Sequence, residues 1–146
     1  MTSFASQAPS GRFAGIAQTL LRVFAAGIFM QHGAQKLLGA FADPAMHGGG
    51  HGLPTRVLIA GIIELVGGGC ILTGLFIRVV AFIASGEMAV AYFTVHFPRG
   101  FWPIENKGEL AVALCFIFLF FAAAGAGPYS LDAVIASRRH GRVDPT

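Results

Sequence analysis

Four long apolar stretches dominate this chain and limit what it can fold into. They cover residues 13–38, 53–76, 78–97 and 110–127. A helix needs roughly 20 mostly apolar residues to cross the hydrocarbon core of a bilayer, and each stretch is close to that length. None shows the alternation of apolar and polar residues that marks a barrel strand. The sequence therefore predicts an all-α fold, an integral membrane four-helix bundle that forms a single domain over residues 1–146.

The composition fits a membrane protein and excludes several other classes. Charged residues make up 12% of the chain and the mean hydropathy is +0.69, whereas soluble domains carry roughly 25% charged residues. No basic stripe is interleaved with aromatic residues, so no nucleic-acid partner is expected. Cys70 and Cys115 lie on separate apolar stretches, which offers neither a CxxC redox pair nor a zinc site. The expected surroundings of the chain are the lipid bilayer.

The connections between the stretches support this arrangement. A very short turn at 76–78 joins the second and third stretches, so these helices are expected to be antiparallel neighbours. Asn106 precedes the fourth stretch and is predicted to cap it together with Glu109, three residues later. The segment 130–139 is predicted to form a short amphipathic helix.

Basic residues near the ends of the stretches predict the orientation. A slight excess falls on the side of the termini, where Arg138, Arg139 and Arg142 cluster. Because cytoplasmic flanks of membrane spans are enriched in Lys and Arg, both termini are predicted to be cytoplasmic. The chain is thus expected to be a multi-pass protein of the bacterial inner membrane.

Three charged residues, Arg22, Glu64 and Glu87, are predicted to fall in one layer near the middle of the membrane. Their depth follows from counting about 1.5 Å of rise per residue along each helix. A charge at this depth is costly and is normally paired or lines a cavity. We expect a buried ion pair between Arg22 and one carboxylate, with the other carboxyl free to exchange protons. The alternative is that these residues only fix the register of the helices.

A second polar layer is predicted near the end of the bundle opposite the termini. Its members are His32, Gln35, Lys36, His96, Asn106 and Glu109. Together they could line the mouth of a pocket for a polar head group, since histidine exchanges protons near neutral pH. The alternative is that Lys36 extends toward the interface and that Asn106 and Glu109 only cap a helix.

Metal binding and nucleotide binding are not expected. His47 and His51 lie on a glycine-rich loop between the first and second stretches, with no cysteine and no second ligand pair at a suitable spacing. The sequence contains no nucleotide-binding glycine pattern and no GxSxG or HExxH motif.

Seven short segments occur in an order that is typical of one family. They lie at residues 32–39 (HGAQKLLG), 64–69 (ELVGGG), 72–78 (LTGLFIR), 87–93 (EMAVAYF), 96–103 (HFPRGFWP), 106–111 (NKGELA) and 127–132 (GPYSLD). With these segments the chain resembles the DoxX family of small bacterial four-helix membrane proteins. The resemblance implies redox work near quinones, because the family is named after a subunit of an archaeal thiosulfate:quinone oxidoreductase. It implies no agreed set of catalytic residues.

We interpret the chain as a protein that binds a quinone or a similar lipid-soluble redox carrier between its helices. Glu64 or Glu87 would exchange a proton, while His32 and Lys36 would hydrogen-bond ring oxygens. The further candidate binding residues are Gln35, His96, Glu109 and Arg22, the last of which would neutralise an acid. No covalently bound cofactor is expected, so electrons would come from a redox partner protein or a soluble donor, as in a subunit of a quinone-linked oxidoreductase.

Two other functions stay open at this point. A proton-coupled transporter would use the carboxyls in the middle of the membrane as coupling groups, more easily as a homodimer than as a monomer. A non-catalytic scaffold or assembly subunit would use the polar layers only to hold the bundle together. An activity that needs a redox donor would indicate the quinone-linked function, whereas an activity that needs only a pH gradient would indicate transport.

Overall fold

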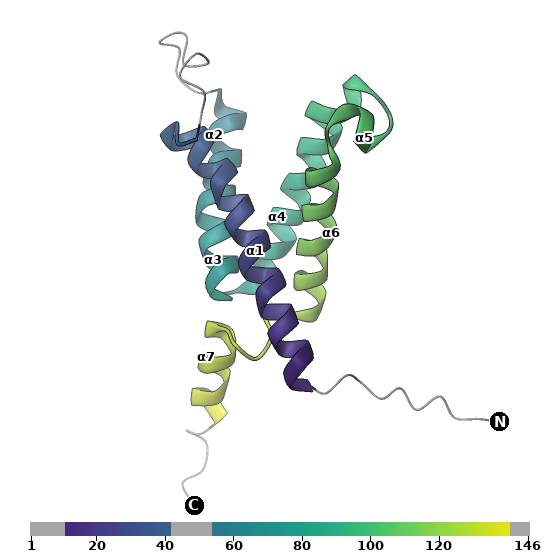
Figure 1. The fold of residues 1–146 in the computed structure, drawn as a ribbon. Helices are drawn as coiled ribbons and strands as arrows, with labels where there is room; N and C mark the ends of the chain where they lie inside the picture. Colours follow the sequence, from purple (N-terminus) through teal and green to yellow (C-terminus); the bar gives the residue numbers. More distant parts are fainter. Residues whose placement is uncertain (1–10, 42–53, 141–146) are drawn as a thin grey trace, which may run out of the picture.

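The computed structural model describes residues 11–41 and 54–140, and these parts contain helices and no strand (Figure 1). The elements are α1 (Gly11–Leu38), α2 (Thr55–Ile62), a π-helical turn (Ile63–Gly67), α3 (Gly68–Thr73), α4 (Ile77–Ala91), a second π-helical turn (Tyr92–His96), a 3-10 turn (Phe97–Arg99), α5 (Pro103–Asn106), α6 (Glu109–Ala124) and α7 (Leu131–His140). The all-α prediction is confirmed for the described parts, and the short C-terminal helix is confirmed as α7.

Three helices of the described chain are long and apolar enough to cross a membrane. They run over Gly11–Leu38, Thr55–Thr73 and Ile77–Arg99. Large apolar side chains on these helices are exposed, Phe24 by 69% and Phe82 by 66%, which suits contact with lipid rather than with water. The chain is therefore a membrane protein. With 16 residues, α6 is shorter; its length of about 24 Å is less than the roughly 30 Å of hydrocarbon, so the fourth span stays a prediction.

The helices pack as two pairs that diverge toward the end away from α7 (Figure 1). In one pair α1 lies against α2 and α3, and in the other α4 lies against α6. Glycine permits the first contact: a β-carbon at Gly33 of α1 would lie 2.5 Å from the backbone nitrogen of Leu65 and 2.9 Å from the carbonyl oxygen of Gly61. α1 therefore runs directly against the backbone on either side of Glu64.

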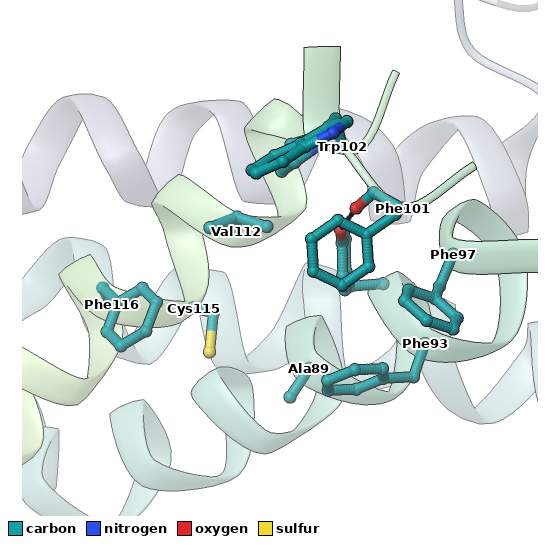
Figure 2. A pocket seen from close by; sticks show the side chains of 10 residues that line it. Ala89, Phe93, Phe97, Phe101, Trp102, Val112, Cys115 and Phe116 are labelled. Carbon is teal, nitrogen blue, oxygen red and sulfur yellow. Dashed lines mark hydrogen bonds between the residues drawn. The ribbon is translucent and has the colours of Figure 1, made fainter. Parts of the chain in front are cut away.

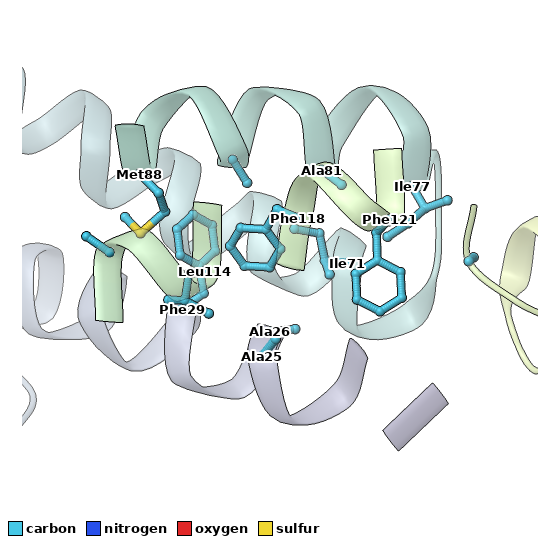
Figure 3. Close-up of a cluster of buried hydrophobic side chains, with 13 residues drawn as sticks. Ala25, Ala26, Phe29, Ile71, Ile77, Ala81, Met88, Leu114, Phe118 and Phe121 are labelled. Carbon is cyan, nitrogen blue, oxygen red and sulfur yellow. The ribbon is translucent and has the colours of Figure 1, made fainter. Parts of the chain in front are cut away.

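A core of small and aromatic side chains joins the two pairs (Figure 3). Phe29 of α1 and Phe118 of α6 are fully buried, and their rings meet edge to face with centroids 4.8 Å apart. Ala81 and Ala84 of α4 are also fully buried, and such small side chains let neighbouring helices approach closely. The core thus fixes α1 relative to the helices that face it across the bundle.

The segment after α6 ties the other end of the bundle together. The turn between α3 and α4 is short, as predicted, and Gly74 and Phe76 adopt positive φ angles of 69° and 50°. The carboxylate of Asp132 accepts hydrogen bonds from the backbone nitrogens of Phe76 (2.9 Å) and Ile77 (3.0 Å). Because these nitrogens belong to the start of α4, Asp132 acts as a cap from a distant part of the sequence.

The predicted cap at the start of the fourth apolar stretch is wrong. Asn106 ends α5, and Gly108 occupies the N-cap position of α6 without a side-chain cap. The buried Asn106 amide instead bonds to the backbone on both sides of it in the sequence: its Oδ1 accepts from the Gly108 nitrogen and its Nδ2 donates to the Gly100 carbonyl oxygen, both at 2.8 Å. Pro103 explains the difference, because proline at a first helical position starts a separate turn there.

Candidate functional site

A polar cavity of about 170 Å³ lies between the two helix pairs, because residues of both pairs line it. It is lined by His32, Lys36, Glu64, Met88, Ala91, His96, Lys107, Leu110, Ala111 and Leu114. Four of these, His32, Lys36, Glu64 and His96, are predicted site residues that the structure brings together. The volume is below the roughly 300–1,000 Å³ of pockets for drug-sized ligands, so it suits a small ring or head group.

An ion pair between Lys36 and Glu64 forms one wall of the cavity. The Lys36 ammonium donates a hydrogen bond to Oε1 of Glu64. The Glu64 side chain is 1% exposed and that of Lys36 is 32% exposed. The sequence predicted these residues in two different layers. The long flexible stem of Lys36 reaches from one layer to the other. The ion pair therefore links the last turn of α1 to the middle of the neighbouring helix.

Two π-helical turns supply titratable side chains to the cavity. The first, Ile63–Gly67, contains Glu64, and the second, Tyr92–His96, ends in His96. A π-turn winds less tightly than an α-helix, so it changes the direction of the side chains that follow, and such turns are frequent at functional sites. Their presence on two facing helices explains how both residues reach one cavity.

Two buried carboxylate oxygens have no hydrogen-bond partner among the described residues. They are Oε2 of Glu64 and Oε2 of Glu87. Glu87, a predicted site residue, is not part of the cavity lining, although its neighbour Met88 is; it interacts electrostatically with Glu64 and Lys36. A buried acceptor without a donor costs about 1–3 kcal/mol, and more when it is charged. Oε2 of Glu64, which lines the cavity, can therefore accept a hydrogen bond from a ligand there, and Oε2 of Glu87 can accept one from a water molecule or a shared proton.

The two histidines reach the cavity from different helices. His32 lies one helical turn before Lys36 on α1, and Nδ1 of His96 lies 3.2 Å from the carbonyl oxygen of Asn106. Because a carbonyl oxygen only accepts, this contact assigns the hydrogen to Nδ1 and leaves Nε2 as the acceptor of the neutral ring. The ring of Tyr92 stacks on His96 with centroids 6.4 Å apart. The orientation of His96 is thus fixed on two sides.

Arg22 does not line the cavity, and the predicted pair between Arg22 and a carboxylate is wrong. Its guanidinium donates to the carbonyl oxygens of Ala126 and Tyr129, where the side chain is 3% exposed. Counting residues along a helix gives the depth of a side chain but not its direction across the bundle. Arg22 faces the segment after α6, whose backbone carbonyls have no helical partner and accept its N–H groups.

Gln35 and Glu109, two further predicted binding residues, also lie outside the cavity lining. Gln35 is exposed and lines a separate pocket of about 200 Å³ with Gln31, His32 and Phe41. Glu109 is exposed in the first turn of α6. His32 lines both pockets, so the two are neighbours. Gln35 therefore lies next to the polar cavity but is not part of its lining.

Lys107 lines the cavity although it was not predicted as a site residue. It follows Asn106 in a segment that resembles a helix start, and its φ angle is 60°. Glycine is the usual residue in this left-handed conformation. The signal in the sequence that could have identified Lys107 was its turn position close to two predicted polar residues, Asn106 and Glu109.

A larger pocket of about 430 Å³ uses other residues of α4 and α6 and has an aromatic wall (Figure 2). Phe93, Phe97, Phe101 and Trp102 form much of this wall. The Tyr92 hydroxyl, which also borders it, donates to the Phe101 carbonyl oxygen at 3.0 Å. No charged side chain lines this pocket, which we call the aromatic groove. The aromatic groove therefore offers apolar contact rather than acid–base chemistry.

No three His, Cys, Asp or Glu side chains that could hold a metal ion lie together in residues 11–41 and 54–140. Cys70 and Cys115 are free thiols in this part of the chain. His47 and His51, the pair on the glycine-rich loop, lie outside the described residues.

Comparisons with known proteins give the chain a family and a relative. Residues 17–97 match the DoxX family. A protein of Haemophilus influenzae (strain Rd) that is described as uncharacterized is 44% identical over 117 residues, which cover 77% of this chain and 85% of that protein. No solved structure matches the chain. The segment matched to the family contains His32, Lys36, Glu64 and His96 and ends before Lys107.

Proposed function

The chain belongs to the DoxX family, and from this premise and the polar cavity we propose that it is a membrane-embedded component of a quinone-linked oxidoreductase. The polar cavity would hold the head group of a quinone or of a similar lipid-soluble redox carrier. A quinone accepts electrons and protons at its ring oxygens. The observation that carries the proposal is the ion pair between Lys36 and the buried Glu64, in which the second glutamate oxygen has no partner among the described residues.

The cost of this ion pair supports a functional role. Moving the Glu64 carboxylate out of water costs several kcal/mol, and its attraction to the partly exposed Lys36 ammonium offsets this only with excellent geometry. Ionisable residues within membrane helices are accordingly rare and mark binding sites or proton pathways. Helix register is already set by Gly33, whose contact with Leu65 leaves no room for a side chain. A purely structural role therefore explains less of the arrangement than a ligand site does.

The side chains around the cavity match the groups of such a ring. The Lys36 ammonium can donate to a ring oxygen, and so can the His32 ring. His96, with its Nδ1 hydrogen held by a backbone carbonyl, has an Nε2 that can accept from a hydroxyl. Glu64 supplies a carboxylate oxygen that can take up and return a proton, and the buried Glu87, next to Met88 of the lining, can exchange a proton with it. The cavity thus combines donors, acceptors and a proton-exchanging group.

The proposal includes a fourth membrane span and a cytoplasmic location of both termini. α6 packs along α4, which belongs to the Ile77–Arg99 helix that is long enough to cross. Local thinning of the bilayer can accommodate a short apolar helix. With four spans, both ends of the chain lie on one side. The exposed Arg138 and Arg139 favour the cytoplasmic side of a bacterial inner membrane. Electrons would reach the cavity from a partner protein or a soluble donor.

A proton-coupled transporter is the second candidate, and Glu87 is the observation that favours it. Its buried Oε2 lacks a partner among the described residues, as does that of Glu64. The two carboxylates therefore form a pair of proton-binding groups on different helices, and chains of such groups move protons in transporters. Transport needs a pH gradient but no bound quinone, so the ligand separates the two candidates.

Quinone bound to the native protein tests the proposal. The protein is extracted with its surrounding lipids into polymer nanodiscs, and quinones are quantified by mass spectrometry. The wild type is compared with the double variant Glu64→Gln, His32→Ala and with Arg56→Gln, which changes an exposed cation of α2 outside the cavity. We expect stoichiometric quinone in the wild type and in Arg56→Gln, and loss of most of it in the double variant. No quinone in any sample, with helical circular dichroism retained, would contradict the proposal and favour transport.

A further inference from the structure

Two hydrogen-bond acceptors of the polar cavity have no donor among the described residues. One is Oε2 of Glu64, which is buried and unpartnered, whereas Oε1 accepts from Lys36. The other is Nε2 of His96. Nδ1 of this ring lies 3.2 Å from the Asn106 carbonyl oxygen and therefore carries the hydrogen of the neutral ring. Both residues line the cavity, so a ligand there meets two acceptors in need of a donor.

The contacts of His96 hold its ring in this state. Asn106 is 1% exposed, and its amide bonds to the backbone of Gly100 and of Gly108, both at 2.8 Å. These bonds keep the Asn106 carbonyl oxygen in place as the acceptor for Nδ1. The ring of Tyr92 stacks on the His96 ring. A rotation that offered the Nδ1 hydrogen to the cavity would break the contact with Asn106, so His96 serves the cavity as an acceptor.

The charges around the cavity do not favour an anion. Lys36 interacts with two carboxyl groups, because Glu87 interacts electrostatically with both Lys36 and Glu64. Oε2 of Glu87 is also buried and has no partner in the described part of the chain. Lys107 is exposed, so water screens its charge. The buried groups thus include more acceptors than cations, which favours a neutral ligand that donates hydrogen bonds.

We propose that the cavity binds the reduced form of the ring, a quinol, more tightly than the oxidised quinone, and that Glu64 and His96 determine this preference. The inference rests on the proposed function and names the redox form of its ligand. The oxygens of a quinone only accept, so Lys36 and His32 can bond to them but both acceptors of the cavity stay without a donor. A quinol hydroxyl donates as well as accepts. Because a buried acceptor without a donor is costly, the cost falls on the quinone complex.

This preference suits a protein that receives electrons for a quinone. The two forms of the ring differ by two electrons, which the proposed redox donor supplies, and by two protons, which come from the surrounding water through the carboxyl groups of the site. A binding site shifts an equilibrium toward the form that it binds more tightly. Tighter binding of the quinol therefore makes the bound quinone easier to reduce.

A matched pair of ligands tests the preference on the full chain in nanodiscs. Duroquinone and durohydroquinone share one methylated ring, are uncharged at neutral pH and differ in the hydrogens on the ring oxygens. Their dissociation constants are measured by calorimetry without oxygen, and empty nanodiscs correct for partition into lipid. Glu64→Gln keeps an oxygen for Lys36 and puts an N–H donor in place of Oε2. His96→Phe keeps a ring beside Tyr92 but has no nitrogen. Glu105→Gln, at an exposed carboxylate outside the cavity lining, is the control.

We expect the wild type and Glu105→Gln to bind durohydroquinone about tenfold or more tightly than duroquinone. In Glu64→Gln the preference should disappear or reverse, because the new amide donates to a quinone oxygen. In His96→Phe it should decrease through weaker binding of durohydroquinone, with binding of duroquinone unchanged. Circular dichroism and thermal unfolding check that each variant folds, and each variant tests the preference independently of the other.

Equal or tighter binding of duroquinone by the wild type would overturn the inference and leave the proposed function intact. An unchanged preference in either folded variant would do the same. If the wild type binds neither compound, the proposed function fails together with this inference.

Discussion

Replacing Lys36 with methionine is expected to destabilise the bundle because it leaves a buried carboxylate without its counter-charge. Methionine keeps much of the apolar stem of lysine and adapts to irregular packing, so the change acts mainly on the charge. Glu64 is 1% exposed, its Oε1 loses the ammonium, and its Oε2 has no partner among the described residues. Both oxygens of the carboxylate would then lack a donor from the chain.

The burial of the two side chains sets the size of the effect. Removing one partner of a fully buried ion pair costs about 3–5 kcal/mol, whereas an exposed pair is worth about 0–1 kcal/mol. Lys36 is 32% exposed, so water screens part of the interaction, and we expect the free energy of unfolding to fall by about 2–3 kcal/mol. The double variant Lys36→Met, Glu64→Gln carries neither charge. Its loss should be smaller than the sum of the single losses by about 1–2 kcal/mol.

Reversible unfolding in mixed micelles, followed by circular dichroism, measures these free energies. Arg56→Met removes an exposed cation of α2 and should stay within about 0.5 kcal/mol of the wild type. A Lys36→Met variant as stable as this control would refute the argument. So would single losses that simply add in the double variant, because the two charges would then not interact.

Two further predictions concern the packing of α1 and the cap of α4. Gly33→Ala should lower the free energy of unfolding by about 1–3 kcal/mol, because its β-carbon would lie 2.5 Å from the Leu65 nitrogen. Gly27→Ala on the same helix, with nothing within 4 Å of the added carbon, should leave the free energy of unfolding unchanged or raise it by up to about 1 kcal/mol, and equal melting temperatures for the two variants would count against the close contact. Asp132→Ala removes the acceptor of the Phe76 nitrogen and should cost about 1 kcal/mol. Hydrogen exchange at Phe76 should accelerate, and an unchanged rate would show that the cap is not formed.

The helical architecture could be predicted because membrane helices require long apolar runs, and such runs are visible in the sequence. The same reasoning identified His32, Lys36, Glu64 and His96, since polar side chains in apolar runs stand out and are seldom tolerated without a partner. The fourth span was harder, because α6 is shorter than its apolar stretch. Gly125 ends the helix there, with a φ of 86°.

The partners of the charged residues could not be predicted from the sequence. Position along a helix gives depth, but contacts also depend on direction, which π-helical turns change at Glu64 and His96. Arg22 was therefore assigned to the wrong partners, although its burial was predicted correctly. Lys107 was missed because the local pattern favoured a cap at Asn106, and the competing helical turn that starts at Pro103 determined the loop.

The location of a bound quinone head group tests the central claim most directly. A photoreactive quinone with its reactive group on the ring can be crosslinked to the protein in nanodiscs, and the modified peptides can be mapped by mass spectrometry. We predict adducts on residues of the polar cavity, such as His32, Met88 and Leu110, which Glu64→Gln reduces. Adducts confined to the aromatic groove around Phe97 and Trp102, unaffected by Glu64→Gln, would contradict the assignment of the polar cavity as the binding site.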